Sequence, residues 1–304
     1  MIHFTGDVKK AGPLAHLLTG LLAANARKRE GQPFDAITER KKSEKTARLA
    51  RIRGVDVTEE RIAGVRVLRL SSGGGARGTV LAFHGGAYVV GVPEALSIPA
   101  ARNGGPDVIS VDYRLAPEHP FPAARDDAMA VYRALLETVG ADKLAVMGDS
   151  AGGGLALTLL QAVAAEGLPM PAALIAMFPW GDLSLSGQSC TTNRGRDVLV
   201  HSEVTIAAGW YAGGRDLQDP ALSPGFGSFT GFPPTYMAVG DLDLIRDDVK
   251  HTAQRMLADG VSVHLDVFPG APHGFNAVPF PAGRQCNRRA RALLDHALPE
   301  RTTA

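Results

Sequence analysis

Residues 144–153 read LAVMGDSAGG, a short apolar run followed directly by a serine between small residues. The run Leu144–Met147 predicts a buried strand, and an apolar helix is expected to begin near Ala151. The intervening Gly148-Asp149-Ser150-Ala151-Gly152 matches G-x-S-x-G, a sharp turn that exposes a serine hydroxyl at the carboxyl end of a sheet. By itself the pattern also fits a glycine-rich turn that binds phosphate or nothing, so its surroundings decide its meaning.

Strands and helices are predicted to alternate around this turn. Short apolar strands separated by helices indicate an α/β protein with a mostly parallel central sheet and helices on both faces. The predicted strands are Arg66–Leu70, Thr79–Phe83, Val108–Val111, Leu144–Met147, Leu174–Phe178, Thr235–Val239 and Val263–Phe268. The predicted helices between and after them are Ala123–Thr138, Ala151–Ala165, Asp247–Asp259 and Arg284–His296.

The interval Gly181–Phe232 interrupts this alternation with a polar loop, a predicted helix over Glu203–Tyr211 and a Gly/Pro-rich return. A long insertion between sheet strands is usually functional. We therefore expect a catalytic core of residues 51–180 and 233–304 under a helical cap. Residues 1–50 form the first part of that cap and residues 181–232 the second.

The first part of the cap contains an amphipathic pattern. Its leucines follow the i, i+3, i+4 spacing of one helix face, which predicts that they pack inward and that part of the face walls the substrate site. They are Leu14, Leu17, Leu18, Leu21 and Leu22. The preceding Lys9-Lys10 gives the run a superficial likeness to a signal peptide, but His16 and Thr19 interrupt it, which favours a helix of the mature protein.

Composition excludes several classes of partner. The chain has 304 residues, 45% of them hydrophobic, and a net charge of +1, so nothing favours binding to nucleic acid or stable association with a membrane. Its two cysteines, Cys190 and Cys286, have no metal-ligand spacing and predict neither a disulfide framework nor a metal site. A cytoplasmic protein is expected.

A second glycine-containing motif, residues 84–88 (HGGAY), follows the predicted strand Thr79–Phe83. Acyl transfer needs backbone N–H groups directed at the developing oxyanion, and small residues let the chain approach closely enough to supply them. We assign this oxyanion loop to Gly85, Gly86 and Ala87, with Ala151 N–H as a further donor. His84 precedes the serine in the chain and is interpreted as structural.

The base that activates Ser150 is expected later in the chain than the serine. His251 and His296 fall in predicted helices and His264 falls in a predicted strand, whereas His273 lies in the loop 269–275 after the last strand. A loop at the carboxyl edge of the sheet is where a base reaches Ser150. His273 is therefore the predicted base.

The acid that orients the imidazole is expected in the loop after the preceding strand. Both Asp241 and Asp243 lie there, and spacing alone does not choose between them. Asp247 and Asp248 are interpreted as charges that favour the N-terminus of the next helix.

Three motifs in order resemble those of the hormone-sensitive-lipase-like esterases, the bacterial family IV group. They are His84-Gly85-Gly86, the run Asp112–Glu118 (DYRLAPE) and Gly148–Gly153, and the resemblance covers about residues 65 to 280. It implies the α/β-hydrolase fold with a helical cap. Its G-x-x-D-x-x-x-D pattern, Gly240 to Asp247, favours Asp243 as the acid, and its His-Gly-Phe pattern maps onto His273. Ala87 stands where the family usually has a third glycine, which narrows the acyl site.

Two further groups of residues receive roles. The charges of the Asp112–Glu118 run are interpreted as a buried ion-pair network that supports the sharp turn at Ser150, the elbow. Aromatic side chains are candidates for lining the substrate pocket, with packing inside the cap as the alternative. The candidates are Tyr88, Trp180, Trp210, Tyr211 and Phe275.

The predicted function is a serine carboxylesterase that hydrolyses short-chain acyl esters through an acyl-enzyme, with no metal or cofactor. A lactone or acetyl-amide hydrolase with the same triad is one alternative. A ligand-binding receptor on the same fold is another, although the family's receptors lack the catalytic histidine that His273 supplies here. The small-molecule ester is the only partner expected, apart from a homodimer formed through the last strand, Val263–Phe268.

Overall fold

An eight-stranded sheet forms the centre of the computed structural model, which describes residues 7–49, 55–71, 77–94, 105–278 and 280–298. Its spatial order is β1-β2-β4-β3-β5-β6-β7-β8. β2 is antiparallel to both of its neighbours and the other pairs are parallel, so the predicted mostly parallel sheet is confirmed. The strands are β1 (Asp56–Ile62), β2 (Val65–Ser71), β3 (Thr79–Phe83), β4 (Asp107–Val111), β5 (Leu144–Asp149), β6 (Ala173–Met177), β7 (Thr235–Gly240) and β8 (Val263–Phe268).

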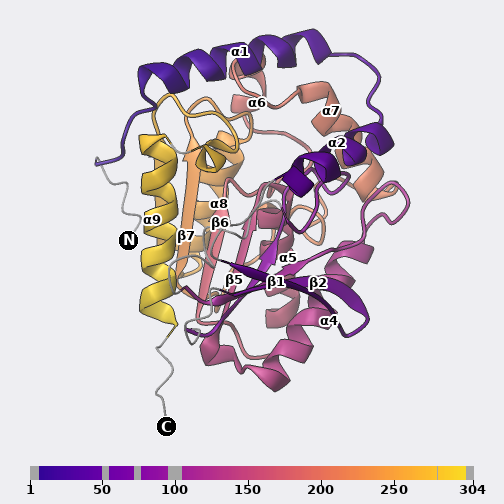
Figure 1. Cartoon of the computed structure of the whole chain (residues 1–304), viewed down its shortest axis with the longest axis vertical. Helices are drawn as coiled ribbons and strands as arrows, with labels where there is room; N and C mark the ends of the chain where they lie inside the picture. Colours follow the sequence, from indigo (N-terminus) through magenta and orange to yellow (C-terminus); the bar gives the residue numbers. More distant parts are fainter. Residues whose placement is uncertain (1–6, 50–54, 72–76, 95–104, 279, 299–304) are drawn as a thin grey trace.

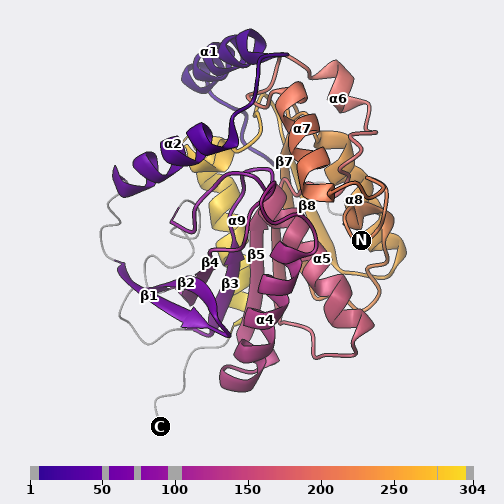
Figure 2. The same ribbon diagram turned by 90° about the vertical axis from the view of Figure 1, so that its right-hand side faces the viewer.

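Helices cover both faces of the sheet and one end of it. Figures 1 and 2 show α9 on one face, α4, α5 and α8 on the other, and α1, α2, α6 and α7 together beyond the carboxyl ends of the strands. None of the described helices is long and apolar enough to cross a membrane. The helices are α1 (Pro13–Arg29), α2 (Ala36–Leu49), α4 (Ala123–Thr138), α5 (Ala151–Ala165), α6 (Ser189–Thr192), α7 (His201–Ala212), α8 (Arg246–Ala258) and α9 (Pro281–Ala297).

Strand β1 was missed by the sequence analysis. Its pattern, DVTEERI, lacks apolar alternation because it is an edge strand whose residues are mostly exposed. It pairs with β2 through a tight turn at Ala63-Gly64, where both residues have positive φ, 51° and 83°. Such a turn matches the twist of a two-stranded hairpin. A solvated hairpin of this kind leaves no hydrophobic signal in the sequence.

The order of the strands determines where the loops meet. From β3 the chain crosses to β4 on one side, and it then returns to β5 on the other side. The loops after β3 and β5 therefore face one another at the carboxyl edge, at the kind of topological switch point where open α/β sheets bind ligands. The loops after β7 and β8 lie further along the same edge. The sheet thus brings together the four predicted site segments.

The predicted orientation of α1 is wrong. Three of its leucines, Leu14, Leu17 and Leu21, are 66%, 62% and 63% exposed. The face that packs inward is made of small residues instead, because these allow the helix backbone to approach the chain beneath it closely. They are Ala15, Thr19, Ala23 and Ala26.

The end of α1 is joined to the insertion after β6 by polar contacts. Arg29 forms an ion pair with Glu203 of α7, and Glu30 forms one with Arg194. The N–H of Gly31 donates to Ser202 Oγ at 2.9 Å. Residues far apart in sequence therefore form one continuous layer above the sheet edge (Figure 2).

Candidate active site

Ser150 lies at the junction of β5 and α5 in a strained conformation, with φ 53° and ψ −123°. A residue other than glycine adopts these backbone angles only when its surroundings enforce them. A Cβ on Gly152 would lie 2.2 Å from Phe83 O, and one on Gly148 would lie 2.1 Å from Gly152 O. Glycine is therefore required on both sides, and the tight turn that results holds the serine hydroxyl clear of the sheet.

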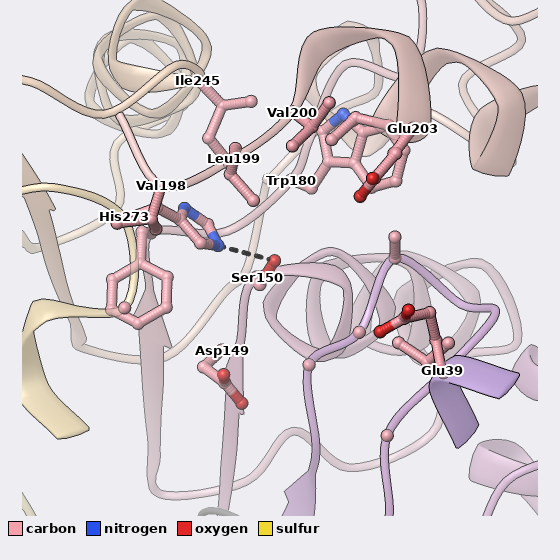
Figure 3. A pocket seen from close by; sticks show the side chains of 18 of the residues that line it. Glu39, Asp149, Ser150, Trp180, Val198, Leu199, Val200, Glu203, Ile245 and His273 are labelled. Carbon is pink, nitrogen blue, oxygen red and sulfur yellow. Dashed lines mark hydrogen bonds between the residues drawn. The ribbon is translucent and has the colours of Figure 1, made fainter. Parts of the chain in front are cut away.

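Three side chains from separate loops form a continuous chain of hydrogen bonds. His273 Nε2 lies 2.9 Å from Ser150 Oγ, as the dashed line in Figure 3 shows. His273 Nδ1 lies 2.9 Å from Asp243 Oδ2. The Asp243 side chain has no solvent exposure, and its other oxygen, Oδ1, accepts the N–H of Ile245 at 3.0 Å. The arrangement suits proton transfer from Ser150 to an imidazole that a fixed carboxylate orients.

The competing residues lie elsewhere. Asp241 Oδ1 accepts the backbone N–H of Gly270 at 2.6 Å, so it shapes the loop before His273 without reaching the imidazole. His264 is 3.1 Å from Asp266, and His251 and His296 belong to α8 and α9. The structure therefore places Asp243 and His273 against Ser150, and places the alternatives away from it.

Electrostatics favour a protonated imidazole at this site. Burial lowers the pKa of His273, but the charge and hydrogen bond of Asp243 raise it, as do the charges of Asp197 and Asp149, and the net pKa lies above its ordinary value. An imidazolium that forms when Ser150 loses its proton is therefore stabilised. The residue is suited to act as a base whose conjugate acid is held in place.

The loop after β3 lies beside the serine and has an irregular backbone. Ala87 has φ 54° and Gly86 has φ 121°, which turns their peptide planes away from regular structure. Within the described residues, the N–H groups of Gly86, Ala87 and Ala151 meet no hydrogen-bond acceptor. Gly85 lies against the Asp149 carboxyl, since a Cβ on this glycine would be 2.8 Å from Asp149 Oδ2. Burial raises the pKa of that carboxyl to about 7.

His84 supports this loop from behind. It is 1% exposed and stacks on Tyr113 with ring centroids 4.3 Å apart. Tyr113 in turn donates its hydroxyl to His84 O at 2.7 Å. Neither ring contacts Ser150, so their place in the structure is that of a scaffold for the loop.

The ion pairs of the Asp112–Glu118 run are not buried, which corrects the expectation from the sequence. The side chains of Asp112, Arg114 and Glu118 are 37%, 48% and 48% exposed. Burying a charge carries a large desolvation cost. Tyr113, which is uncharged, is therefore the one polar residue of this run that is buried. The partners are Arg66 for Asp112, Asp127 for Arg114 and Arg40 of α2 for Glu118.

Ser150 and His273 open into a cavity of about 390 Å³. One wall is apolar and comes from the insertion and the loop after β7, through Val198, Leu199, Val200 and Ile245 (Figure 3). Two carboxylates, Glu39 and Glu203, lie on the side formed by α2 and α7. The cavity is suited to a small, mainly apolar substrate with a more polar end directed at α2 and α7.

Of the aromatic residues predicted to line the pocket, Trp180 lines this cavity (Figure 3). Tyr88, Trp210, Tyr211 and Phe275 do not line it in the described structure, which corrects their assignment. Tyr88 stacks on Tyr211 at 3.8 Å between centroids, and Trp210 stacks on Phe34 at 5.6 Å. Tyr88 and Tyr211 are buried, because large rings bury much apolar area in the interior, and Trp210 is half-buried. Phe275 instead packs on Phe268 and borders a separate cavity of about 250 Å³ on the far side of His273.

Other lining residues were missed. Phe178 follows β6 with φ 35° and meets the His273 ring edge-on, with centroids 4.7 Å apart. Glu39 comes from α2, and Val198 and Glu203 come from the insertion after β6, where the sequence has no motif to single them out. The sequence offered one signal for a lining residue, which is a position directly after a buried strand, and among these residues only Phe178 has such a position.

The arrangement of motifs, sheet and site is shared with known proteins. A family model described as "alpha/beta hydrolase fold" matches residues 80–277. A crystal structure titled as a hormone-sensitive lipase from a metagenome library superimposes with a TM-score of 0.90 at 33% identity, over 96% of this chain and all of that one. The chain belongs to the hormone-sensitive-lipase-like esterases of the α/β-hydrolase fold.

Curated relatives of this esterase carry names for ester and acetyl hydrolysis. An acetyl-hydrolase of Streptomyces hygroscopicus is 37% identical over 230 residues, 73% of this chain and 77% of that protein. A carboxylesterase of Mycobacterium tuberculosis is 34% identical over 235 residues, 72% of this chain and 73% of its own. The chain is a serine esterase, and the receptor alternative is not supported, because His273 is present and bonded to Ser150.

Among the described residues, no group of three or more His, Cys, Asp or Glu side chains is placed to hold a metal ion.

Proposed function

We propose that this esterase hydrolyses short-chain acyl esters with Ser150 as nucleophile, His273 as general base and acid, and Asp243 as the orienting acid. The observation that carries the proposal is the unbroken hydrogen-bond chain Ser150–His273–Asp243 at the wall of the cavity. His273 removes the proton from Ser150, whose oxygen bonds to the ester carbonyl carbon. The proton then passes to the leaving alcohol, and a water activated by His273 releases the acid.

The oxyanion of each tetrahedral intermediate is held, in this proposal, by the N–H groups of Gly86, Ala87 and Ala151. Support comes from their lack of competing acceptors within the described chain. Gly85 belongs to the same loop and lines the cavity beside these residues. Donors fixed before the reaction stabilise the charge as it forms, without reorganisation.

The preference for short acyl groups rests on the size of the cavity and on its wall. A volume of about 390 Å³ is at the low end for ligand pockets. The methyl group of Ala87 adds bulk at the oxyanion loop. The name of the Streptomyces relative favours acetyl esters in particular. Lactones and acetyl amides use the same chemical groups and are the substrates against which esters are to be compared.

We further propose that residues 1–50 and 181–232 act as one cap over residues 51–180 and 233–304. The ion pairs from the end of α1 to the insertion support this division. A homodimer through β8 is proposed because β8 is an edge strand of the sheet, and light scattering tests it. The cysteines Cys190 and Cys286 are free and buried, which is compatible with the cytoplasmic location we infer, and the net charge of +1 gives no reason for a nucleic-acid partner.

Trapping of the acyl-enzyme tests the proposal. Rapid mixing with p-nitrophenyl acetate should release a burst of one nitrophenol per enzyme, and mass spectrometry should locate one acetyl group on the peptide that carries Ser150. A panel of acetyl to decanoyl esters, lactones and acetanilides then ranks the substrates. An acetyl group on a cysteine, or turnover without any acylated Ser150, would contradict the mechanism.

A further inference from the structure

Asp197 is a buried carboxylate in the insertion that the mechanism above does not use. It lies between α6 and α7 and has no solvent exposure. Its oxygens accept three backbone N–H groups: Oδ1 from His273 at 2.8 Å and Val198 at 2.7 Å, and Oδ2 from Leu244 at 2.8 Å. A carboxylate taken out of water is tolerated when hydrogen bonds satisfy it in this way.

Two of these bonds join the loops that carry the triad. Leu244 directly follows Asp243 in the loop after β7, and His273 belongs to the loop after β8. The side-chain bond between Asp243 and His273 spans 30 residues of chain, so no local structure fixes its length. Asp197 connects the backbones of the two loops next to that bond, and so holds their separation.

The same segment of the insertion holds the acid loop at other points. Asn193, which is 1% exposed, donates its amide to Asp241 O at 3.0 Å and Asp243 O at 2.9 Å. Ser189 Oγ donates to Leu244 O at 2.8 Å. The acid loop is thus attached to the cap insertion rather than only to the strand that precedes it.

We propose that Asp197 is a positioning residue through which the cap insertion holds the Asp243 and His273 loops in the geometry needed for proton transfer. The inference rests on the proposed triad. Asp197 does not touch substrate or Ser150 Oγ in this role. It acts through the backbones of His273 and Leu244 and through its charge.

The charge of Asp197 has a measurable consequence. Burial raises its pKa to about 7, with the neighbouring Asp243 charge adding to the rise and His273 opposing it. The charged groups that face His273 are Asp243, Asp197 and Asp149, and each raises its pKa. Removal of the Asp197 charge therefore lowers the pKa of His273, so that the base stays deprotonated to a lower pH.

The position of Asp197 also connects the triad to the substrate cavity. Val198, Leu199 and Val200 directly follow it in the chain and line that cavity. The rate depends strongly on the placement of the reacting groups, since a misplacement of about 1 Å lowers it on the order of 100-fold.

The test compares Asp197→Asn with Asp182→Asn. Asp182 is a matched control because it is also buried in the insertion and accepts backbone N–H groups, from Ser184 and Ser186, with no bond to either triad loop. The asparagine at 197 keeps an acceptor for His273 but has no charge and presents an NH₂ group to the N–H of Leu244. We expect kcat for p-nitrophenyl acetate to fall about 10- to 100-fold with KM within about threefold.

The pH profile separates positioning from simple destabilisation. In Asp197→Asn the acid limb of kcat/KM should move to lower pH, and in Asp182→Asn it should stay at the wild-type position. Equal losses of kcat in both variants, in proportion to their melting temperatures and with unmoved acid limbs, would overturn the inference. Ser150→Ala measured in parallel keeps the two proposals apart. An active Ser150→Ala enzyme refutes the triad itself, whereas an inactive one beside an unaltered Asp197→Asn enzyme refutes only the role of Asp197.

Discussion

The carboxyl edge of the sheet and the cap above it are built by different means. At the edge, Ser150, Asp243 and His273 are fixed by a tight turn, by burial and by hydrogen bonds of 2.9 Å. In the cap, contacts such as Arg29–Glu203 join side chains that are 42% and 16% exposed. Partly exposed ion pairs contribute little free energy, whereas buried, oriented groups contribute much. We therefore expect changes at the edge to alter the chemical step, and changes in the cap to alter recognition.

The largest effect expected is at the elbow. Ser150→Ala removes the nucleophile and should reduce kcat by about 10⁴- to 10⁶-fold, leaving only the residual rate that binding and the oxyanion hole supply. Ester turnover measures it, and circular dichroism should show an unchanged fold, because within the described part of the chain the hydroxyl bonds only His273. Wild-type-like turnover would assign the chemistry to some other residue.

The second largest effect is expected to distinguish the roles of Asp243 and Asp241, two carboxylates of the same loop. Asp243→Asn should reduce kcat by about 10²- to 10⁴-fold, because an amide no longer holds the imidazole in the correct tautomer. Asp241→Asn should reduce it less than about tenfold, since among the described residues the Asp241 side chain bonds only the backbone N–H of Gly270. Steady-state kinetics of the pair decide the matter, and reversed losses would identify Asp241 as the acid.

The pH dependence should report the environment of His273. The base works only when deprotonated, and its pKa is raised above the ordinary 6.5. Activity should therefore decline as pH falls through a value above 6.5, by about tenfold for each further unit. A kcat/KM profile measures this limb, and a limb at or below pH 6 would contradict the charge environment described here.

A change in the cap should be milder. Glu203→Gln removes the charge that Arg29 pairs with at the cavity wall, so KM should change by about two- to fivefold with kcat nearly constant. The control is Glu166→Gln, which breaks the exposed pair with Arg133 away from the cavity and should leave both constants unchanged. A fall in kcat rather than a change in KM for Glu203→Gln would contradict the expectation that changes in the cap alter recognition and not the chemical step.

The smallest effect expected is on the outer face of α1. Leu17→Gln should change the free energy of unfolding by less than about 0.5 kcal/mol, because this leucine is 62% exposed. Ala23→Leu, at a position 3% exposed, should destabilise the protein by about 1–3 kcal/mol through overpacking. Urea unfolding compares them, and the opposite ranking would mean that the leucine face packs inward as the sequence predicted.

Much of the core followed from sequence because its signals are local. The run of apolar residues before Gly148 and the small residues around Ser150 specify a strand, a turn and a helix without distant information. The seven predicted strands are present, with ends shifted by a residue or two, and the strand that was missed, β1, lacks an apolar pattern. The resemblance of three motifs added Asp243, which spacing by itself left undecided.

The sequence by itself therefore determined the fold class, the elbow and the loop that carries His273. Tertiary structure alone decided which face of α1 is buried, which side chains line the cavity, and that Asp197 bridges two loops 47 and 76 residues away. The physical reason is the range of the interactions. Backbone periodicity and turn sterics act over a few residues, whereas close packing of a cap and satisfaction of a buried carboxylate depend on groups that meet only when the chain is folded.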